Sequence, residues 1–199
     1  MNHYYTKNDD LRSEPREIRA VFSVYGFSFF TDIGVFSKDA VDYGTRTLID
    51  TLIMNVSNQE MRILDVGCGY GPIGIVLGKL YPKLRIDMVD INDRAIELTK
   101  KNIVNNEISN ADVFSSNIYE NVEGEYSIII SNPPIRAGKH IVHTIIEQGK
   151  QYLEDDGELW IVIQKKQGAA SAKKKMFDTF GNAEVVRRNK GYFIIRSKS

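Results

Sequence analysis

The sequence lacks a second cysteine, a long apolar run and the layout of a secretory signal. Cys68 is its only cysteine, which excludes an intrachain disulfide and favours a reducing compartment. The longest apolar runs, such as residues 159–163, have the length of a strand and are too short to span a membrane. Met1-Asn2-His3 does not begin the basic-then-apolar pattern of a signal peptide. Together these absences predict a cytoplasmic protein.

Internal repeats, low-complexity segments and metal-binding clusters are also missing. His140 and His143 are three residues apart, but no carboxylate or cysteine lies nearby at ligand spacing, so we predict no metal site. A chain of 199 residues with 42% hydrophobic and 26% charged residues can bury one domain well and is short for two. We therefore expect a single domain over residues 1–199, with residues 1–38 as an N-terminal extension over its ligand site.

The formal net charge is zero, but the charges are unevenly distributed. Residues 165–199 contain ten Lys and Arg residues against two acidic ones, which gives +8 for this segment and −8 for residues 1–164. A run such as Lys173-Lys174-Lys175 is often only a solvated helix face. Ten cations in 35 residues instead favour a surface that faces a polyanion, and nucleic acid is the natural partner.

Strand-like and helix-like segments alternate through the middle of the chain. Strands are predicted at about 62–66, 85–90, 111–115, 126–132 and 157–164, and helices at about 40–54, 71–81, 93–106, 138–153 and 169–180. Such alternation requires crossover helices and a largely parallel sheet. Residues 183–188 and 192–197 are β-rich and separated by three residues, which predicts an antiparallel hairpin. The predicted fold class is α/β: a doubly wound, mostly parallel seven-stranded sheet that ends in an antiparallel hairpin.

Local signals set the expected ends of several elements. Residues 19–25 and 27–31 resemble a small hairpin that turns at Tyr25-Gly26. Asp39 is expected to cap the helix over 40–54. Asp93 and Glu97 are residue types typical of a helix N-terminus and are expected to start the helix over 93–106.

A glycine-rich turn follows the first strand of the alternating region. Gly67, Gly69 and Gly71 alternate with other residues directly after a buried-strand pattern, so the backbone there can approach an adenosine-containing ligand closely. Asp90 ends the next strand, where its carboxylate can accept hydrogen bonds from both hydroxyls of a ribose. These two features alone fit either a nicotinamide dinucleotide or a sulfonium cofactor.

Two details favour the sulfonium cofactor. The glycine spacing differs from the Gly-x-Gly-x-x-Gly turn that seats a pyrophosphate on a helix N-terminus. Asp65 places a negative charge at the strand end, which would repel a diphosphate but suits a cationic amino-acid group, unless it only caps its own loop. Cys68 lies inside the turn without a histidine to activate it, so we interpret it as a small loop residue and not a nucleophile.

The tripeptide Asn132-Pro133-Pro134 follows another apolar strand and predicts the chemistry. The Asn132 side-chain carbonyl and the Pro133 backbone carbonyl can each accept one hydrogen of a planar exocyclic amine. The lone pair of that amine then turns out of the ring plane, and the prolines stiffen the turn that aims both carbonyls. A structural role for the turn alone is the competing interpretation.

With these motifs in place, residues 64–71, Asp90 and the Asn-Pro-Pro tripeptide resemble class I S-adenosyl-L-methionine-dependent methyltransferases. Residues 34–37, 42–45 and 116–117 are similar to the small-domain group that contains the ribosomal small-subunit RNA guanine-N2 methyltransferases. The resemblance implies a cofactor site formed by Asp65, Gly67, Cys68, Gly69, Gly71, Asp90, Ile91, Ser116, Asn117 and Asn132. It also implies that Asn132, Pro133 and Pro134 are catalytic and that Phe36 and Lys38 close over the site.

The sequence departs from this family at position 135 and in length. Many members have an aromatic residue after the two prolines that stacks on the target base, whereas Ile135 offers only an apolar contact; Phe27, Phe29 or Phe36 are candidates to replace it. Guanine-N2 enzymes of this group often carry a second, degenerate methyltransferase-like half. Here the N-terminal extension, the basic C-terminal third or self-association would have to bind the substrate instead.

The resemblance implies an S-adenosylmethionine-dependent transfer to the N2 amine of a guanine in ribosomal RNA, by a monomer or homodimer. Two alternatives stay open. A protein-glutamine methyltransferase would use the same Asn-Pro-Pro chemistry, because a side-chain amide is an equally poor nucleophile. A non-catalytic RNA-binding module could have kept the fold.

Overall fold

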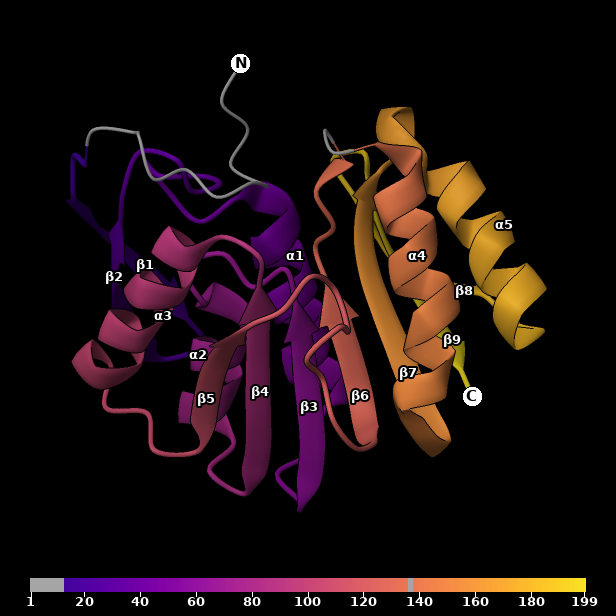
Figure 1. Ribbon diagram of the computed structural model, residues 1–199, viewed down its shortest axis with the longest axis horizontal. Helices are drawn as coiled ribbons and strands as arrows, with labels where there is room; N and C mark the ends of the chain where they lie inside the picture. Colours follow the sequence, from indigo (N-terminus) through magenta and orange to yellow (C-terminus); the bar gives the residue numbers. More distant parts are fainter. Residues whose placement is uncertain (1–12, 136–137) are drawn as a thin grey trace.

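The computed structural model describes residues 13–135 and 138–199. The expectations for the first twelve residues, including the absence of a signal peptide and the start of the extension, fall outside the described residues. A seven-stranded sheet forms the centre of the molecule, and a separate two-stranded hairpin lies beside it (Figure 1). No helix within the described ranges is both long and apolar enough to cross a membrane.

The central sheet has the predicted doubly wound topology. Its strands lie in the order β5-β4-β3-β6-β7-β9-β8, and every neighbouring pair from β5 to β7 is parallel. The last strand along the chain, β9, pairs antiparallel with both β7 and β8, which confirms the expected C-terminal hairpin. The strands are β3 (Met61–Val66), β4 (Leu84–Asp90), β5 (Ala111–Ser115), β6 (Tyr126–Ser131), β7 (Leu153–Gln164), β8 (Glu184–Asn189) and β9 (Tyr192–Lys198).

Helices cover both faces of the sheet, because consecutive residues of the central strands are apolar and point to opposite faces. Ile63 and Ile130 face α1, α2 and α3, whereas their neighbours Leu64 and Ile129 face α4 and α5 (Figure 1). The helices are α1 (Tyr43–Asn55), α2 (Pro72–Leu80), α3 (Asp93–Asn105), α4 (Lys139–Gly149) and α5 (Ala169–Phe180), with 3-10 turns η2 (Lys150–Tyr152) and η3 (Lys165–Gln167).

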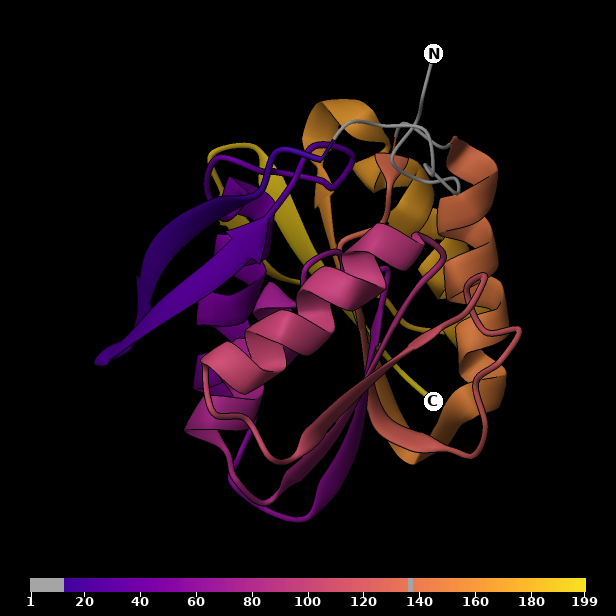
Figure 2. The ribbon, with the colours of Figure 1, turned by 60° about the vertical axis from the view of Figure 1, so that its left-hand side comes forward.

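The N-terminal hairpin, β1 (Arg16–Phe22) and β2 (Tyr25–Thr31), lies beside α3 (Figure 2). Side-chain amides of α3 and its C-cap fasten β2 to the helix. Asn102 accepts from the Phe30 N–H at 2.6 Å and donates to the Phe30 carbonyl at 3.0 Å. One helical turn later, Asn106 makes the same pair of contacts with Ser28, at 3.2 and 2.8 Å. The two amides therefore take the place of a neighbouring strand for β2.

Several predicted boundaries were wrong. The hairpin turns at Ser23 and Val24 instead of at Tyr25-Gly26, since Tyr25 already pairs with Phe22. Asp42 caps α1 by accepting from the Thr45 N–H at 3.1 Å, whereas Asp39 pairs with Arg16.

Two more boundaries differ farther along the chain. The N-cap of α3 is Asn92, which accepts from the Arg94 N–H, and Asp93 is the first helical residue. The helix expected over 138–153 ends at Gly149, and β7 begins at Leu153, four residues before the predicted start. Leu153 pairs with Tyr126, so the strand begins at this residue.

Replacing Asn102 with alanine should destabilise the protein by about 2–4 kcal/mol, because buried backbone groups of Phe30 and Tyr70 would have no partner. The free energy of unfolding from denaturant titration measures this change. Asn105→Ala is the matched control: Asn105 is exposed and donates only to the Ser28 carbonyl. Equal stability of the two variants would show that the amide contacts do not hold the hairpin.

Candidate active site

A cavity of about 670 Å³ opens at the carboxyl ends of the parallel strands, where a doubly wound sheet binds its ligands. It extends from the turn after β3 past the ends of β4 and β6 to the end of β7 and the start of β9. Twelve of the predicted site residues line it: Phe36, Gly67, Cys68, Gly69, Asp90, Ile91, Ser116, Asn117, Asn132, Pro133, Pro134 and Ile135.

The glycine turn presents its backbone to this cavity. Gly67 and Gly69 have φ angles of +76° and +61°, which favour glycine, and a Cβ added at either one would meet no protein atom within 4 Å. The N–H groups of Gly67 and Cys68 both donate to the Val89 carbonyl, at 2.8 and 3.0 Å. The turn is therefore held from behind, and the space in front of the two glycines suits a ligand that approaches closely.

The Asp90 carboxylate belongs to the same framework. One oxygen accepts from the Gly69 N–H and the other from the Asn92 N–H, each at 2.9 Å. Burial raises the pKa of Asp90, while these hydrogen bonds oppose the rise. Each carboxylate oxygen has a second acceptor site. Asp90 is therefore fixed in orientation and still able to accept from a ligand in the cavity.

Asp65 lies buried beneath the turn instead of on the cavity wall. Its side chain is 1% exposed, and neither carboxylate oxygen has a hydrogen-bond partner among the described residues. Burial raises its pKa to about 7; the nearby backbone N–H of Gly74, in the first turn of α2, lowers the pKa, and the charge of Asp90 raises it. A buried, unpartnered carboxylate fits a site that receives a cationic group.

Asn132 is held by the first turn of α1. Its amide nitrogen donates to Thr45 Oγ1 at 2.8 Å and to Asp42 Oδ2 at 3.4 Å. These contacts fix the nitrogen end of the amide, so its oxygen is presented as an acceptor. Residues 42–45 stood out in the sequence only through a family resemblance. Asp42 and Thr45 could have been assigned this supporting role only from the tertiary structure.

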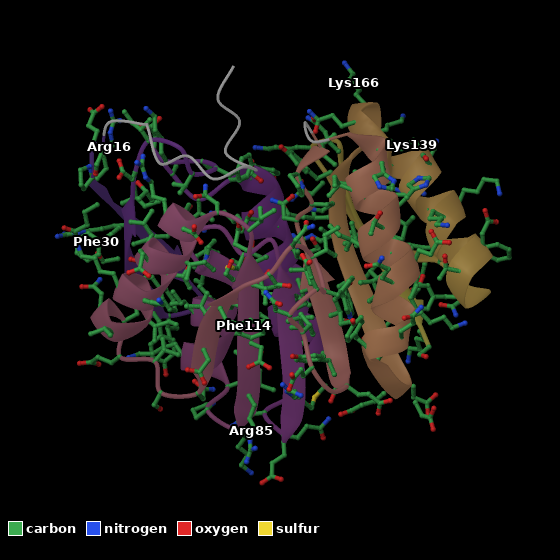
Figure 3. All side chains as sticks on the ribbon, in the orientation of Figure 1. Arg16, Phe30, Arg85, Phe114, Lys139 and Lys166 are labelled. Atoms are coloured by element: carbon green, nitrogen blue, oxygen red, sulfur yellow. The ribbon has the colours of Figure 1, made fainter. Side chains whose placement is uncertain are left out.

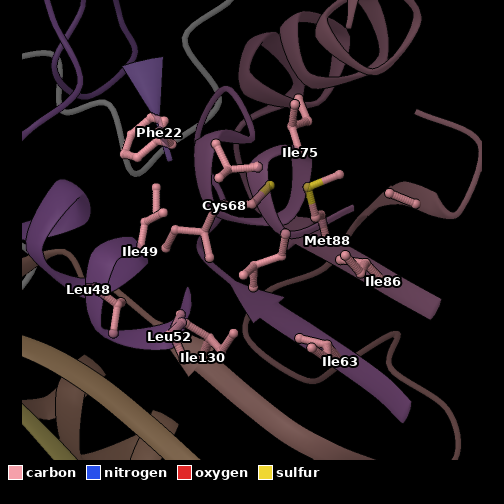
Figure 4. Packing of buried hydrophobic residues seen from close by; sticks show 14 of the residues in the cluster. Phe22, Leu48, Ile49, Leu52, Ile63, Cys68, Ile75, Ile86, Met88 and Ile130 are labelled. Atoms are coloured by element: carbon pink, nitrogen blue, oxygen red, sulfur yellow. The ribbon is translucent and has the colours of Figure 1, made fainter. Parts of the chain in front are cut away.

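Cys68 shows why a residue inside the motif need not be reactive. Its side chain points into the hydrophobic core beside Ile75 and Met88, and 4% of the residue is exposed (Figure 4). Burial raises the pKa of its thiol well above the ordinary value, so the thiol stays protonated. The interpretation of Cys68 as a loop residue agrees with this packing.

Two other predicted site residues are not part of the cavity wall. Gly71 is the N-cap of α2, and a Cβ on it would lie 2.8 Å from Thr99 Cγ2, so it serves close packing. The Lys38 carbonyl accepts a hydrogen bond from Thr31 Oγ1 at 2.6 Å, whereas Phe36 lines the cavity.

Within the described part of the chain, no group of three His, Cys, Asp or Glu side chains could hold a metal ion.

The methyltransferase small domain family matches residues 26–196. The chain belongs to this family. A Bacillus subtilis relative, the uncharacterized protein YbxB, is 44% identical over 198 residues and matches along 98% of both chains. The ribosomal RNA small subunit methyltransferase C of Erwinia tasmaniensis is 33% identical over 168 residues. That match covers 82% of this chain and 47% of the relative, so the chain spans about half the length of such enzymes.

Solved structures show the same fold. The Thermus thermophilus 16S rRNA N2 G1207 methyltransferase, in complex with AdoMet and guanosine, superposes with a TM-score of 0.85 at 19% identity. The superposition covers 94% of this chain and 51% of the Thermus thermophilus chain. A ribosomal protein L11 methylase from Lactobacillus delbrueckii superposes with a TM-score of 0.68 over 81% of this chain and 85% of its own, also at 19% identity.

Family membership decides between the two cofactors that the glycine turn and Asp90 left open. S-adenosyl-L-methionine is the methyl donor of the methyltransferase family, in agreement with the predicted sulfonium cofactor. The residues present fit this donor, because the turn leaves space in front of two glycines and Asp65 is an unpartnered carboxylate beneath them.

The pKa of Asp65 predicts a pH dependence of stability. Because folding raises it from 3.8 to about 7, the folded protein holds an extra proton in that window. The free energy of unfolding should therefore fall as pH rises from about 4 to 7, by up to about 1.4 kcal/mol per pH unit. Denaturant titrations of the cofactor-free protein and of Asp65→Asn measure it. The difference in the free energy of unfolding between the two proteins should change with pH and level off above about pH 7. A difference that stays constant with pH would contradict the raised pKa of Asp65.

Proposed function

We propose that this protein transfers a methyl group from S-adenosyl-L-methionine to the exocyclic N2 amine of a guanine in small-subunit ribosomal RNA. The observation that carries the proposal is the fixed Asn132 amide, which shares one cavity with the glycine turn and Asp90. The names of the ribosomal RNA methyltransferase relatives support the substrate class. Such a substrate would place the enzyme in the cytoplasm, as the sequence analysis expected.

The cofactor would occupy the half of the cavity above β3, β4 and β5. Asp90 would accept from the ribose hydroxyls, and the backbone of Gly67 and Gly69 would face the donor closely. Ile91, Ser116 and Asn117 would surround the adenine, and the Asp65 charge beneath the turn would attract the ammonium group of the donor. When bound, S-adenosyl-L-methionine supplies an electrophilic methyl group.

The protein's task is to aim a weak nucleophile. A purine amine is weak because its lone pair is delocalised into the ring. In our proposal Asn132 Oδ1 and the Pro133 carbonyl each accept one amine hydrogen, so the nitrogen becomes pyramidal and its lone pair is localised on the side of the cofactor half. Thr45 and Asp42 keep the Asn132 oxygen in that position. The surplus proton leaves after transfer, so a strongly basic side chain is unnecessary.

We further propose that lysines at the cavity rim hold the RNA backbone. Lys165, Lys166 and Lys190 are exposed and form no ion pair within the described residues; Figure 3 labels Lys166. The Lys165 N–H donates to the Gly191 carbonyl at 2.7 Å, which joins the turns that carry these lysines. The cavity-lining residues Gln164, Gln167 and Tyr192 lie within two positions of them in sequence.

The lysine run on α5 is a weaker candidate for RNA binding. Lys174 pairs with Asp178 at 2.6 Å, and Lys175 pairs with Glu147 of α4 at 2.9 Å. Farther along, Arg196 and Lys198 both pair with Glu158. Four of the ten cations in the C-terminal third are therefore paired with carboxylates, whereas the three rim lysines form no ion pair within the described residues.

The substrate class can be tested by following tritium-labelled methyl groups from the cofactor to total RNA, ribosomal subunits and total protein in parallel. Transfer to small-subunit RNA supports the proposal. Transfer to protein would favour glutamine methylation, which uses the same Asn-Pro-Pro chemistry. Binding of RNA and cofactor without any transfer would favour a non-catalytic module.

Replacing Asn132 with alanine should lower methyl transfer by about 10²-fold or more, because the variant has no preorganised acceptor for the reacting amine. Cofactor affinity, measured by isothermal titration, should change little. Asp90→Ala should show the opposite pattern and weaken cofactor binding by about 1.5–3 kcal/mol for each ribose hydrogen bond removed. Normal turnover by Asn132→Ala would reduce the Asn-Pro-Pro turn to a structural role.

Charge reversal at the rim should weaken RNA binding. Changing Lys165, Lys166 and Lys190 to Glu should lower affinity and flatten its log–log salt dependence by about 0.7–0.9 for each phosphate group that the protein no longer neutralises. Changing Lys173, Lys174 and Lys175 to Glu provides a control with the same charge change on α5. A larger effect in the α5 variant would move the RNA-binding face to that helix.

A further inference from the structure

The cavity is longer than its cofactor half. Beyond Asn132 it continues over the end of β7 and the start of β9, where Gln164, Gln167 and Tyr192 line its wall. The glycine turn and Asp90 lie on the other side of Asn132, above β3 and β4. We call this second part the β7–β9 lobe. The β7–β9 lobe therefore offers space for a substrate next to Asn132 and outside the cofactor half.

Most aromatic residues that could replace an aromatic at position 135 are inaccessible to a substrate. Phe27 and Phe29 are 3% and 0% exposed, stack on each other in the core and do not line the cavity. Tyr70 lines it but is 3% exposed and packs edge-on against Phe29. Phe36 belongs to the segment that α3 holds through the Gly34 carbonyl, on the cofactor side. Tyr192 is the aromatic side chain of the β7–β9 lobe.

The Tyr192 ring is held in one orientation. Gly44 of α1 lies directly against it, so a Cβ at that position would come within 2.7 Å of Tyr192 Cε1. The Tyr43 ring lies 5.8 Å away at a tilt of 44°. Tyr192 is half-buried between α1 and the cavity. A ring clamped on its α1 side and bordering the cavity on the other is suited to stack on a planar ligand.

We propose that Tyr192 is the platform on which the target purine stacks while Asn132 holds its amine. The inference rests on the proposed function and assigns the recognition of the base to the β7–β9 lobe. The base would enter this lobe turned out of its own stack, as enzymes that modify bases require. Its polar edge would face the Gln164 and Gln167 side chains, and Lys165, Lys166 and Lys190 would hold the adjoining phosphates.

Three variants test this assignment through the kinetics of methyl transfer to small-subunit RNA. Tyr192→Leu should lower kcat/KM by roughly 5- to 160-fold, the range that corresponds to the removal of one base stack. Tyr192→Phe keeps the ring and should retain most of the activity. Phe193→Leu is the matched control, since Phe193 is the next residue of β9 and packs on the opposite face of the sheet. It should leave kcat/KM close to wild type.

Two further readouts separate a platform from a structural residue. Cofactor affinity and melting temperature of Tyr192→Leu should match those of Phe193→Leu. In the presence of S-adenosylhomocysteine, guanosine should give saturation-transfer NMR signals with wild type and Tyr192→Phe but much weaker ones with Tyr192→Leu. Wild-type kinetics or guanosine signals in Tyr192→Leu would overturn the platform. Absence of transfer to RNA by the wild type would instead overturn the proposed function and the platform with it.

Discussion

The last two residues of β4 hold the cofactor half of the site together. The Val89 carbonyl accepts from two consecutive N–H groups of the glycine turn after β3, and the Asp90 carboxylate accepts from a third. The Asp90 carbonyl also accepts from the Ser116 N–H, which fixes the loop after β5. The loops after β3 and β5 are therefore both held by the end of β4, the strand between them. A ligand that bridges these loops meets backbone groups already in place, so little ordering is left for binding to induce.

Helix α3 supports this framework from the outer side. Thr99 donates to the Gly69 carbonyl at 2.8 Å, and Asn102 donates to the Tyr70 carbonyl at 2.9 Å. At its N-terminus, Asn92 and Arg94 donate to the carbonyls of Gly34 and Ile33. The same helix thus positions the glycine turn and the segment that brings Phe36 to the cavity. The N-terminal hairpin, which also depends on α3, stabilises the site indirectly and not by lining it.

The features that could be predicted from sequence were those that depend on neighbours along the chain. The alternation of strands with helices, the glycine turn and the Asn-Pro-Pro tripeptide each depend on local backbone geometry. The structure shows the expected fold, with both motifs at one edge of the sheet. The misses came from tertiary choices between similar residues. Asp39 and Asp42 are both able to cap a helix, but only Asp42 also meets Asn132. Phe27 and Phe29 looked accessible for stacking until the hairpin buried them against α3 and Tyr70.

The two halves of the cavity differ in how they are built, and this bears on specificity. The cofactor half is defined by backbone groups, the buried Asp65 and the half-buried Asp90, and the fold that positions it is shared with enzymes named for RNA and for protein substrates. In the proposed mechanism, Asn132 and Pro133 would contact only the hydrogens of the amine, so they would not distinguish one planar amine from another. We therefore expect the choice of substrate to depend on side chains beyond them, such as Gln164 at the end of β7 and Tyr192 at the start of β9. On this proposal, a change of substrate would require new residues in the β7–β9 lobe and none in the glycine turn.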